Sequence, residues 1–159
     1  MTANLLAIAL YLVRAYTDLA YTHNYVFTYT YGGMVYATQA RDLTAEQLLT
    51  VCSVSKASRG AGYALRFRPT TAQKQVLLSM GATTLCSKRY FDELVKSSKY
   101  NKGENAEMLV TEKMFGQTWE KDSVPFTQAG DIEQDGIAWQ HKHEGATFCN
   151  ERSLRHLAK

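Results

Sequence analysis

The sequence predicts an α+β (mixed α/β) fold, with one β-hairpin and several helices in its N-terminal region and a second hairpin near the C-terminus. Residues 25–31 and 34–38 are rich in aromatic and β-branched types, and Gly32-Gly33 separates them, as in a hairpin. Several later stretches repeat apolar residues with helical spacing. Two further short strand patterns flank Asp135-Gly136.

The composition predicts an ordinary globular protein of 159 residues, with one domain or a compact pair sharing a core. Cys52, Cys86 and Cys149 form an odd, widely spaced set, which suits a reducing compartment better than a disulfide framework. The apolar run 5–13 is too short for a membrane span, and no basic segment precedes it. We therefore expect a cytoplasmic protein with no membrane partner.

The elements of the N-terminal region follow in order. An apolar face with helical spacing predicts a helix over 3–18, and the hairpin comes next, with its tyrosines on a half-buried face. Thr44 is expected to cap a helix that runs toward Cys52, and a glycine-rich loop then leads to a strand over 63–67.

Two more helices complete this region. Thr70 and Thr71 are expected to cap one through residue 80, ended by Gly81, and another covers 88–96. The polar segment 97–103 predicts a boundary, which gives an α+β region over 1–98 for recognition of DNA or a partner and a second region over 99–159.

The second region should begin with a helix over 103–114, with Gly116 past its end. A short strand at 118–120, the Asp135-Gly136 hairpin, a strand at 146–149 and a helix from Asn150 follow. Glu107 falls close to the apolar stripe of the first helix, which is costly unless a cation meets it, although a glutamate favoured by the helix dipole is nearly as good an explanation.

Charge is distributed unevenly along the chain. Residues 41–102 carry 11 Lys and Arg against 4 Asp and Glu, whereas residues 103–159 carry 6 against 10. A basic middle predicts a polyanion partner, and a solvated surface without a partner explains it about equally well. Arg66 and Arg68 alternate with apolar residues and can share a face, so they are the best phosphate contacts, and Arg59 and Lys74 complete the predicted nucleic-acid-binding set.

The second hairpin carries the residues best suited to chemistry. Asp131 begins its first strand, and alternation puts Gln140 and Lys142 on one face of the second strand, with Trp139 and His141 on the other. An acid, a second oxygen donor and an amine can therefore converge at one hairpin.

This order of motifs resembles the PD-(D/E)XK nuclease superfamily. The matching pieces are Gly103 with Glu107, Gly130-Asp131, and Gln140-His141-Lys142, in about the last third of the chain. The resemblance implies a restriction endonuclease-like mixed sheet with flanking helices and hydrolysis of duplex or branched DNA with Mg²⁺ or Mn²⁺. Asp131, Gln140, Glu107 and the backbone carbonyl of His141 would hold the metal, and Lys142 would assist the attack of water.

The sequence departs from the family pattern in three respects. Gln140 stands where the family more often has Glu, and Gly130 stands in place of Pro. The last core strand of the family is also missing after the C-terminal helix, so the N-terminal hairpin or a second subunit of a homodimer would have to supply it.

Two other functions remain open. His141, His143, Cys149 and His156 are residue types that bind zinc, but their spacing fits no standard zinc site. The chain is also compatible with a non-catalytic phage or mobile-element factor that binds nucleic acid or a host protein through a decayed nuclease fold.

Overall fold

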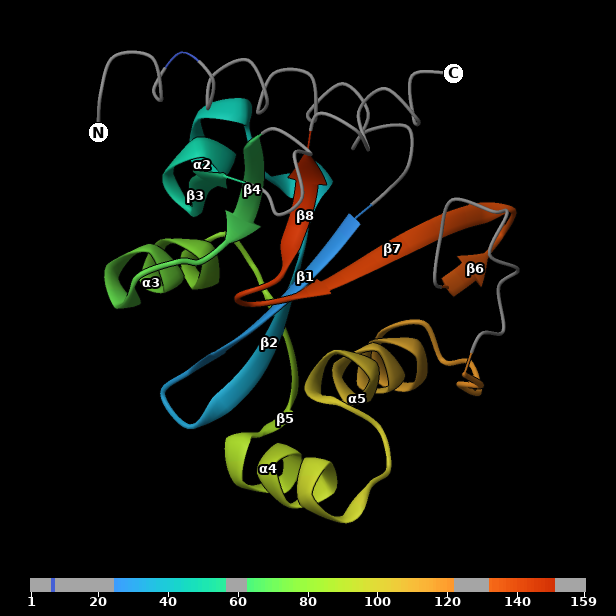
Figure 1. Cartoon of the computed structure of the whole chain (residues 1–159). Helices are drawn as coiled ribbons and strands as arrows, with labels where there is room; N and C mark the ends of the chain where they lie inside the picture. Colours follow the sequence, from blue (N-terminus) through green and yellow to red (C-terminus); the bar gives the residue numbers. More distant parts are fainter. Residues whose placement is uncertain (1–6, 8–24, 57–62, 122–131, 151–159) are drawn as a thin grey trace.

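The computed structural model describes residue 7 and residues 25–56, 63–121 and 132–150. Within these residues the chain forms a five-stranded sheet, a three-stranded sheet and helices α2 to α5 (Figure 1). The predicted α+β class is confirmed. No helix formed by these residues combines the length and the apolar character needed to cross a membrane.

The five-stranded sheet is mixed and has the strand order β5-β2-β1-β7-β6. Its strands are β1 (Tyr25–Tyr31), β2 (Met34–Gln39), β5 (Thr83–Ser87), β6 (Ile132–Gln134) and β7 (Ile137–His143). Strand β1 pairs antiparallel with β2 and parallel with β7, and β7 pairs antiparallel with β6. The predicted N-terminal and C-terminal hairpins therefore join at the centre of one sheet.

Helices α4 (Lys88–Ser97) and α5 (Lys102–Leu109) cover one face of this sheet (Figure 1). Val26 of β1 and Trp139 of β7 pack there in one cluster with Phe91 of α4 and Leu109 of α5. After α5 the chain continues through a π-helical turn, Val110–Met114. The predicted helix over 103–114 is thus confirmed, with a change of helical type in its last part.

The opposite face packs against the three-stranded sheet, which has the order β3-β4-β8. Its strands are β3 (Cys52–Lys56), β4 (Tyr63–Phe67) and β8 (Thr147–Asn150). Phe27 of β1 stacks on Phe67 of β4 with ring centroids 4.6 Å apart, and both side chains are fully buried. Helices α2 (Ala45–Thr50) and α3 (Thr71–Ser79) add Leu48 and Leu77 to this second core.

Helix starts follow the predicted capping chemistry. In each of the four helices α2 to α5, the N-cap oxygen accepts from the backbone N–H three residues on, which satisfies a donor that the helix leaves unpaired. The four caps are Thr44, Thr70, Ser87 and Asn101. The predicted caps at Thr44 and Thr70 are confirmed.

The structure also corrects the sequence-based expectations. Residues 118–120 form no strand, and strands β3 and β5 were not predicted. The boundary predicted near residue 98 does not divide the central sheet. Strand β1 precedes residue 98 in the sequence and β7 follows it, and the two strands pair with each other. The predicted helix over 3–18 and the predicted C-terminal helix lie outside the described residues, apart from Ala7 and Asn150.

Candidate functional site

The hairpin of β6 and β7 forms as the sequence predicts. Asp135 and Gly136 both have positive φ, at 54° and 76°, which matches the turn type that two-residue hairpins favour. The register pairs Ile132 with Trp139 and Gln134 with Ile137. Asp131, the predicted main metal ligand, directly precedes β6 and lies outside the described residues.

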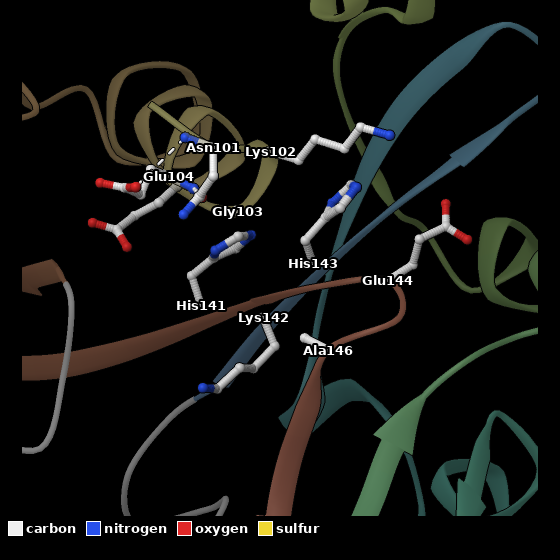
Figure 2. Close-up of a pocket in the computed structure, with 10 residues that line it drawn as sticks. Asn101, Lys102, Gly103, Glu104, His141, Lys142, His143, Glu144 and Ala146 are labelled. Atoms are coloured by element: carbon white, nitrogen blue, oxygen red, sulfur yellow. Dashed lines mark hydrogen bonds between the residues drawn. The ribbon is translucent and has the colours of Figure 1, made fainter. Parts of the chain in front are cut away.

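Side chains along β7 alternate between the two faces of the sheet. His141 is 6% exposed and faces the helices, whereas Gln140 and Lys142 are half-buried on the other face. The parallel pairing places Gln140 opposite Tyr25 and Lys142 opposite Phe27. In Figure 2 the side chain of Lys142 leaves the strand in the direction opposite to the ring of His141. The prediction that Gln140 and Lys142 share a face apart from His141 is confirmed.

Glu107 of α5 lies on the helix-covered side. It lines a pocket of about 430 Å³ together with His141, Lys142 and His143 of β7, and Gln140 is not among the lining residues. One of its oxygens, Oε1, accepts a hydrogen bond of 2.8 Å from the indole N–H of Trp119. The structure therefore brings Glu107 next to the two histidines, and alternation directs the side chain of Gln140 away from this pocket.

A buried polar cluster links β1 to β7 beside this pocket. The hydroxyl oxygen of Thr28 lies 2.8 Å from His141 Nε2 and 2.8 Å from His143 Nδ1. Thr28 is fully buried, and a hydroxyl has only one proton, so it can donate to one ring at most and must accept from the other ring if both contacts are hydrogen bonds. The cluster is therefore a polar link between the two hairpins.

Both rings of this cluster favour the neutral form. Burial, followed by the charges of His143 and Lys142, lowers the pKa of His141 to about 3. Burial also lowers the pKa of His143, with Glu144 opposing the shift and Lys102 and Lys74 adding to it. The sequence pattern His-x-His indicated a shared face, but Thr28 was not predicted as their partner.

The two faces of β7 differ in the metals that their donors suit. In the described ranges no group of three His, Cys, Asp or Glu residues could hold a metal ion. For the predicted zinc site, His141 and His143 each direct one ring nitrogen to Thr28, whereas the side chain of Cys149 and all of His156 lie outside the described residues.

On the other face of β7, Gln140 offers an amide oxygen and Lys142 an amine. The imidazoles of β7 point to the opposite face. Hard cations take oxygen ligands. The amide oxygen of Gln140 is of the kind that Mg²⁺ or Mn²⁺ takes, whereas Asp131, the carboxylate predicted beside it, lies outside the described residues.

The predicted phosphate contacts have different surroundings. Arg66 and Arg68 alternate with the buried Leu65 and Phe67, as predicted, but only Arg68 is exposed. Arg66 is half-buried, and its Nε atom is buried without a hydrogen-bond partner among the described residues. Arg59 lies outside the described residues.

Lys74 is held inside the protein by a network that the sequence did not reveal. Its ammonium lies 2.9 Å from Glu144 Oε2 and donates to the carbonyl oxygen of Thr30 at 2.6 Å. Glu144 Oε1 in turn accepts from the backbone N–H and the hydroxyl of Thr30, at 2.7 and 2.9 Å. Burial raises the pKa of Glu144, but these hydrogen bonds and the charge of Lys74 outweigh it, so the pKa is lowered overall. Lys74 therefore joins α3 to the five-stranded sheet.

Comparison with known proteins gives no relative for this chain. No protein-family model matches it, and neither a curated protein nor a solved structure matches it significantly.

Proposed function

We propose that the protein is a metal-dependent DNA nuclease whose site is the face of the β6–β7 hairpin that carries Gln140 and Lys142. One observation carries the proposal. Gln140 and Lys142 lie two residues apart on the same face of β7, and Asp131 directly precedes the paired strand β6. The imidazoles of His141 and His143, which would favour a softer metal, are on the other face.

The surroundings of the hairpin support a restriction endonuclease-like core. Helix α5 precedes the hairpin in the sequence and packs on the sheet that contains it. Strand β1 runs parallel to β7 on the side away from β6. We propose that β1 takes the place of the last core strand of the family, so that a second subunit is not required for that purpose.

The proposed roles follow from the chemistry of each group. Asp131 and Gln140 would hold Mg²⁺ or Mn²⁺, which when bound neutralises phosphate charge and makes water a better nucleophile. Lys142 would donate to a phosphate oxygen and hold the attacking water in line with the phosphorus. Glu107 is given no metal-binding role, because Gln140, the proposed ligand on β7, is not among the residues that line its pocket, and its carboxylate accepts a hydrogen bond from Trp119.

Cleavage assays test this proposal. Purified protein is incubated with supercoiled, linear and branched DNA in Mg²⁺ or Mn²⁺, beside Asp131→Ala, Lys142→Ala and the control Lys113→Ala, whose lysine is exposed on the π-helical turn. We expect the wild type and the control to cut and the other two variants to lose at least about a hundredfold in rate. Absence of cleavage by the wild type, or full activity of both site variants, would refute the proposal.

Gln140→Glu gives a second, independent readout. The substitution adds one negative charge to the proposed metal site. The variant should therefore reach half-maximal cleavage at a lower Mg²⁺ concentration than the wild type. An unchanged or higher Mg²⁺ requirement would remove Gln140 from the proposed ligand set.

A non-catalytic DNA-binding function is the second candidate. The position of Glu107 favours it, since the residue that would complete the acidic set of the family lines the other side of β7. This candidate predicts that the wild type binds DNA with or without divalent metal and never cuts it.

A further inference from the structure

Many of the basic residues of the chain gather at one edge of the fold. Five of the 11 Lys and Arg residues in 41–102 lie on α4 or between α4 and the start of α5. They are Lys88, Arg89, Lys96, Lys99 and Lys102. None of them belongs to the set that the sequence suggested for nucleic-acid binding, and all five are exposed.

These cations differ in how far acidic neighbours neutralise them. Lys88 lies 2.6 Å from Asp92 and the Nε atom of Arg89 lies 3.6 Å from Glu93, as i,i+4 pairs along α4. Within the described part of the chain, Lys96 and Lys102 form no ion pair, and Lys99 lies over the ring of Tyr100 at 5.3 Å. Lys96, Lys99 and Lys102, called the basic edge below, therefore carry uncompensated charge.

The surface at the basic edge is hollowed. Lys96 and Lys102 line a pocket of about 550 Å³ together with Gly33, Val95 and the two ion pairs Lys88–Asp92 and Arg89–Glu93, so its lining carries four cations against two carboxylates. Lys102 also lines the pocket beside the histidines (Figure 2), so it contributes to both pockets. The described residues that line the larger pocket include no aromatic ring on which a base could stack, which favours phosphate contacts over base contacts.

Helix α5 adds to the positive potential at this edge. Lys102 is its first residue, where the helix dipole is positive and a cation is unfavourable unless an anion is near. Lys96, in contrast, is in the last turn of α4, where a cation is favourable. Glu104 in the first turn of α5 opposes the unfavourable effect of Lys102, while the charge of Lys102 and the positive end of the helix dipole both favour an anion at this edge.

We propose that the basic edge is a phosphate-binding surface for duplex DNA, used without regard to base sequence. The inference rests on the proposed function in taking DNA as the ligand, and it places the contact on α4 and α5 rather than on Arg66 and Arg68 of the β4 segment. The basic edge lies on the helix-covered side of the sheet, whereas Gln140 and Lys142 face the other side. Lys102 and Lys142 nevertheless line the same pocket, so the basic edge borders the strand that carries the proposed cleavage site.

Equilibrium binding with paired variants tests the basic edge. Fluorescence anisotropy of a labelled 30-base-pair duplex of mixed sequence is measured in chelator between 0.05 and 0.3 M salt. Lys96→Ala with Lys102→Ala is compared with Arg41→Ala with Lys113→Ala, which removes the same charge from two exposed cations outside α4 and α5. Each phosphate contact contributes about 0.9 to the slope of log K against log salt, so the first variant should have a slope shallower by about 2 and bind roughly tenfold more weakly at 0.1 M. The control should resemble the wild type.

Three results would overturn the inference. The first is equal loss in both double variants, which would indicate general charge and not a surface. The second is unchanged binding of the Lys96 and Lys102 variant. The third is a wild type that binds polyglutamate but no duplex, which would identify an acidic protein as the partner. Cleavage that persists in the second case would leave the proposed nuclease function standing, whereas the third case would refute both.

Discussion

Acidification should destabilise the protein through the buried histidine at the junction of its two hairpins. The pKa of His141 is about 3 in the folded chain, and an unfolded histidine titrates near 6.5. Between these two values the unfolded state binds a proton that the folded state excludes, so stability is lost as the pH falls below about 6.5. At pH 5 the difference spans about 1.5 pH units, which corresponds to about 2 kcal/mol in the free energy of unfolding.

Urea unfolding at pH 7, 6 and 5 measures this effect. Trp139, which is 7% exposed, reports the transition by fluorescence. His141→Gln is the matched variant, because a glutamine amide reaches toward Thr28 without titrating in this range. Its unfolding free energy should decline by about 2 kcal/mol less than that of the wild type between pH 7 and pH 5. Parallel declines in the two proteins, or a wild type that is equally stable at both pH values, would refute the reasoning.

Four further substitutions test local features by chemical denaturation. Glu144→Gln should lower the free energy of unfolding by about 2 kcal/mol, because it breaks a half-buried ion pair with Lys74. Asp92→Asn, which breaks the exposed pair with Lys88, should lower it by less than about 0.5 kcal/mol. Equal losses in the two variants would contradict this account. Gly103→Ala should raise the free energy of unfolding by about 0.5 kcal/mol, because the added Cβ meets only one side-chain oxygen, at 3.4 Å, and alanine favours a helix. A lower denaturation midpoint in this variant would contradict the prediction. Gly136→Ala should cost about 1 to 2 kcal/mol, because φ is +76°, and an unchanged midpoint would argue against this turn.

Features with a local cause were predictable from the sequence. Asp135-Gly136 marks the second hairpin, because a tight turn needs positive φ at both positions. Thr44 and Thr70 mark helix starts, because each hydroxyl satisfies a nearby N–H. The prediction of a strand at 118–120 was wrong, because side-chain contacts, and not pairing with a strand, hold this segment in place. Trp119 there bonds to Glu107 and packs edge-on against Tyr100.

Features that depend on distant partners were not predictable in the same way. Strand β3 reads Cys-Ser-Val-Ser-Lys and β5 reads Thr-Thr-Leu-Cys-Ser, and neither has the aromatic content that marks β1. The sequence raised the N-terminal hairpin as one source of a missing strand, but the parallel pairing of β1 with β7 comes only from tertiary structure. Similarly, Glu107 shares a sequence motif with Gln140 and Lys142, and only the packing of α5 reveals that it lines the opposite side of β7.

The most direct test of the nuclease proposal is the single-turnover rate of plasmid nicking at saturating protein, for the wild type and Lys142→Ala. Saturation removes any difference in affinity, so the rate reports the chemical step alone. The proposed role of Lys142 predicts that the wild type nicks DNA only with Mg²⁺ or Mn²⁺ and that the variant is at least about a hundredfold slower. Bound DNA that the wild type never cuts, or equal rates in the two proteins, would contradict it.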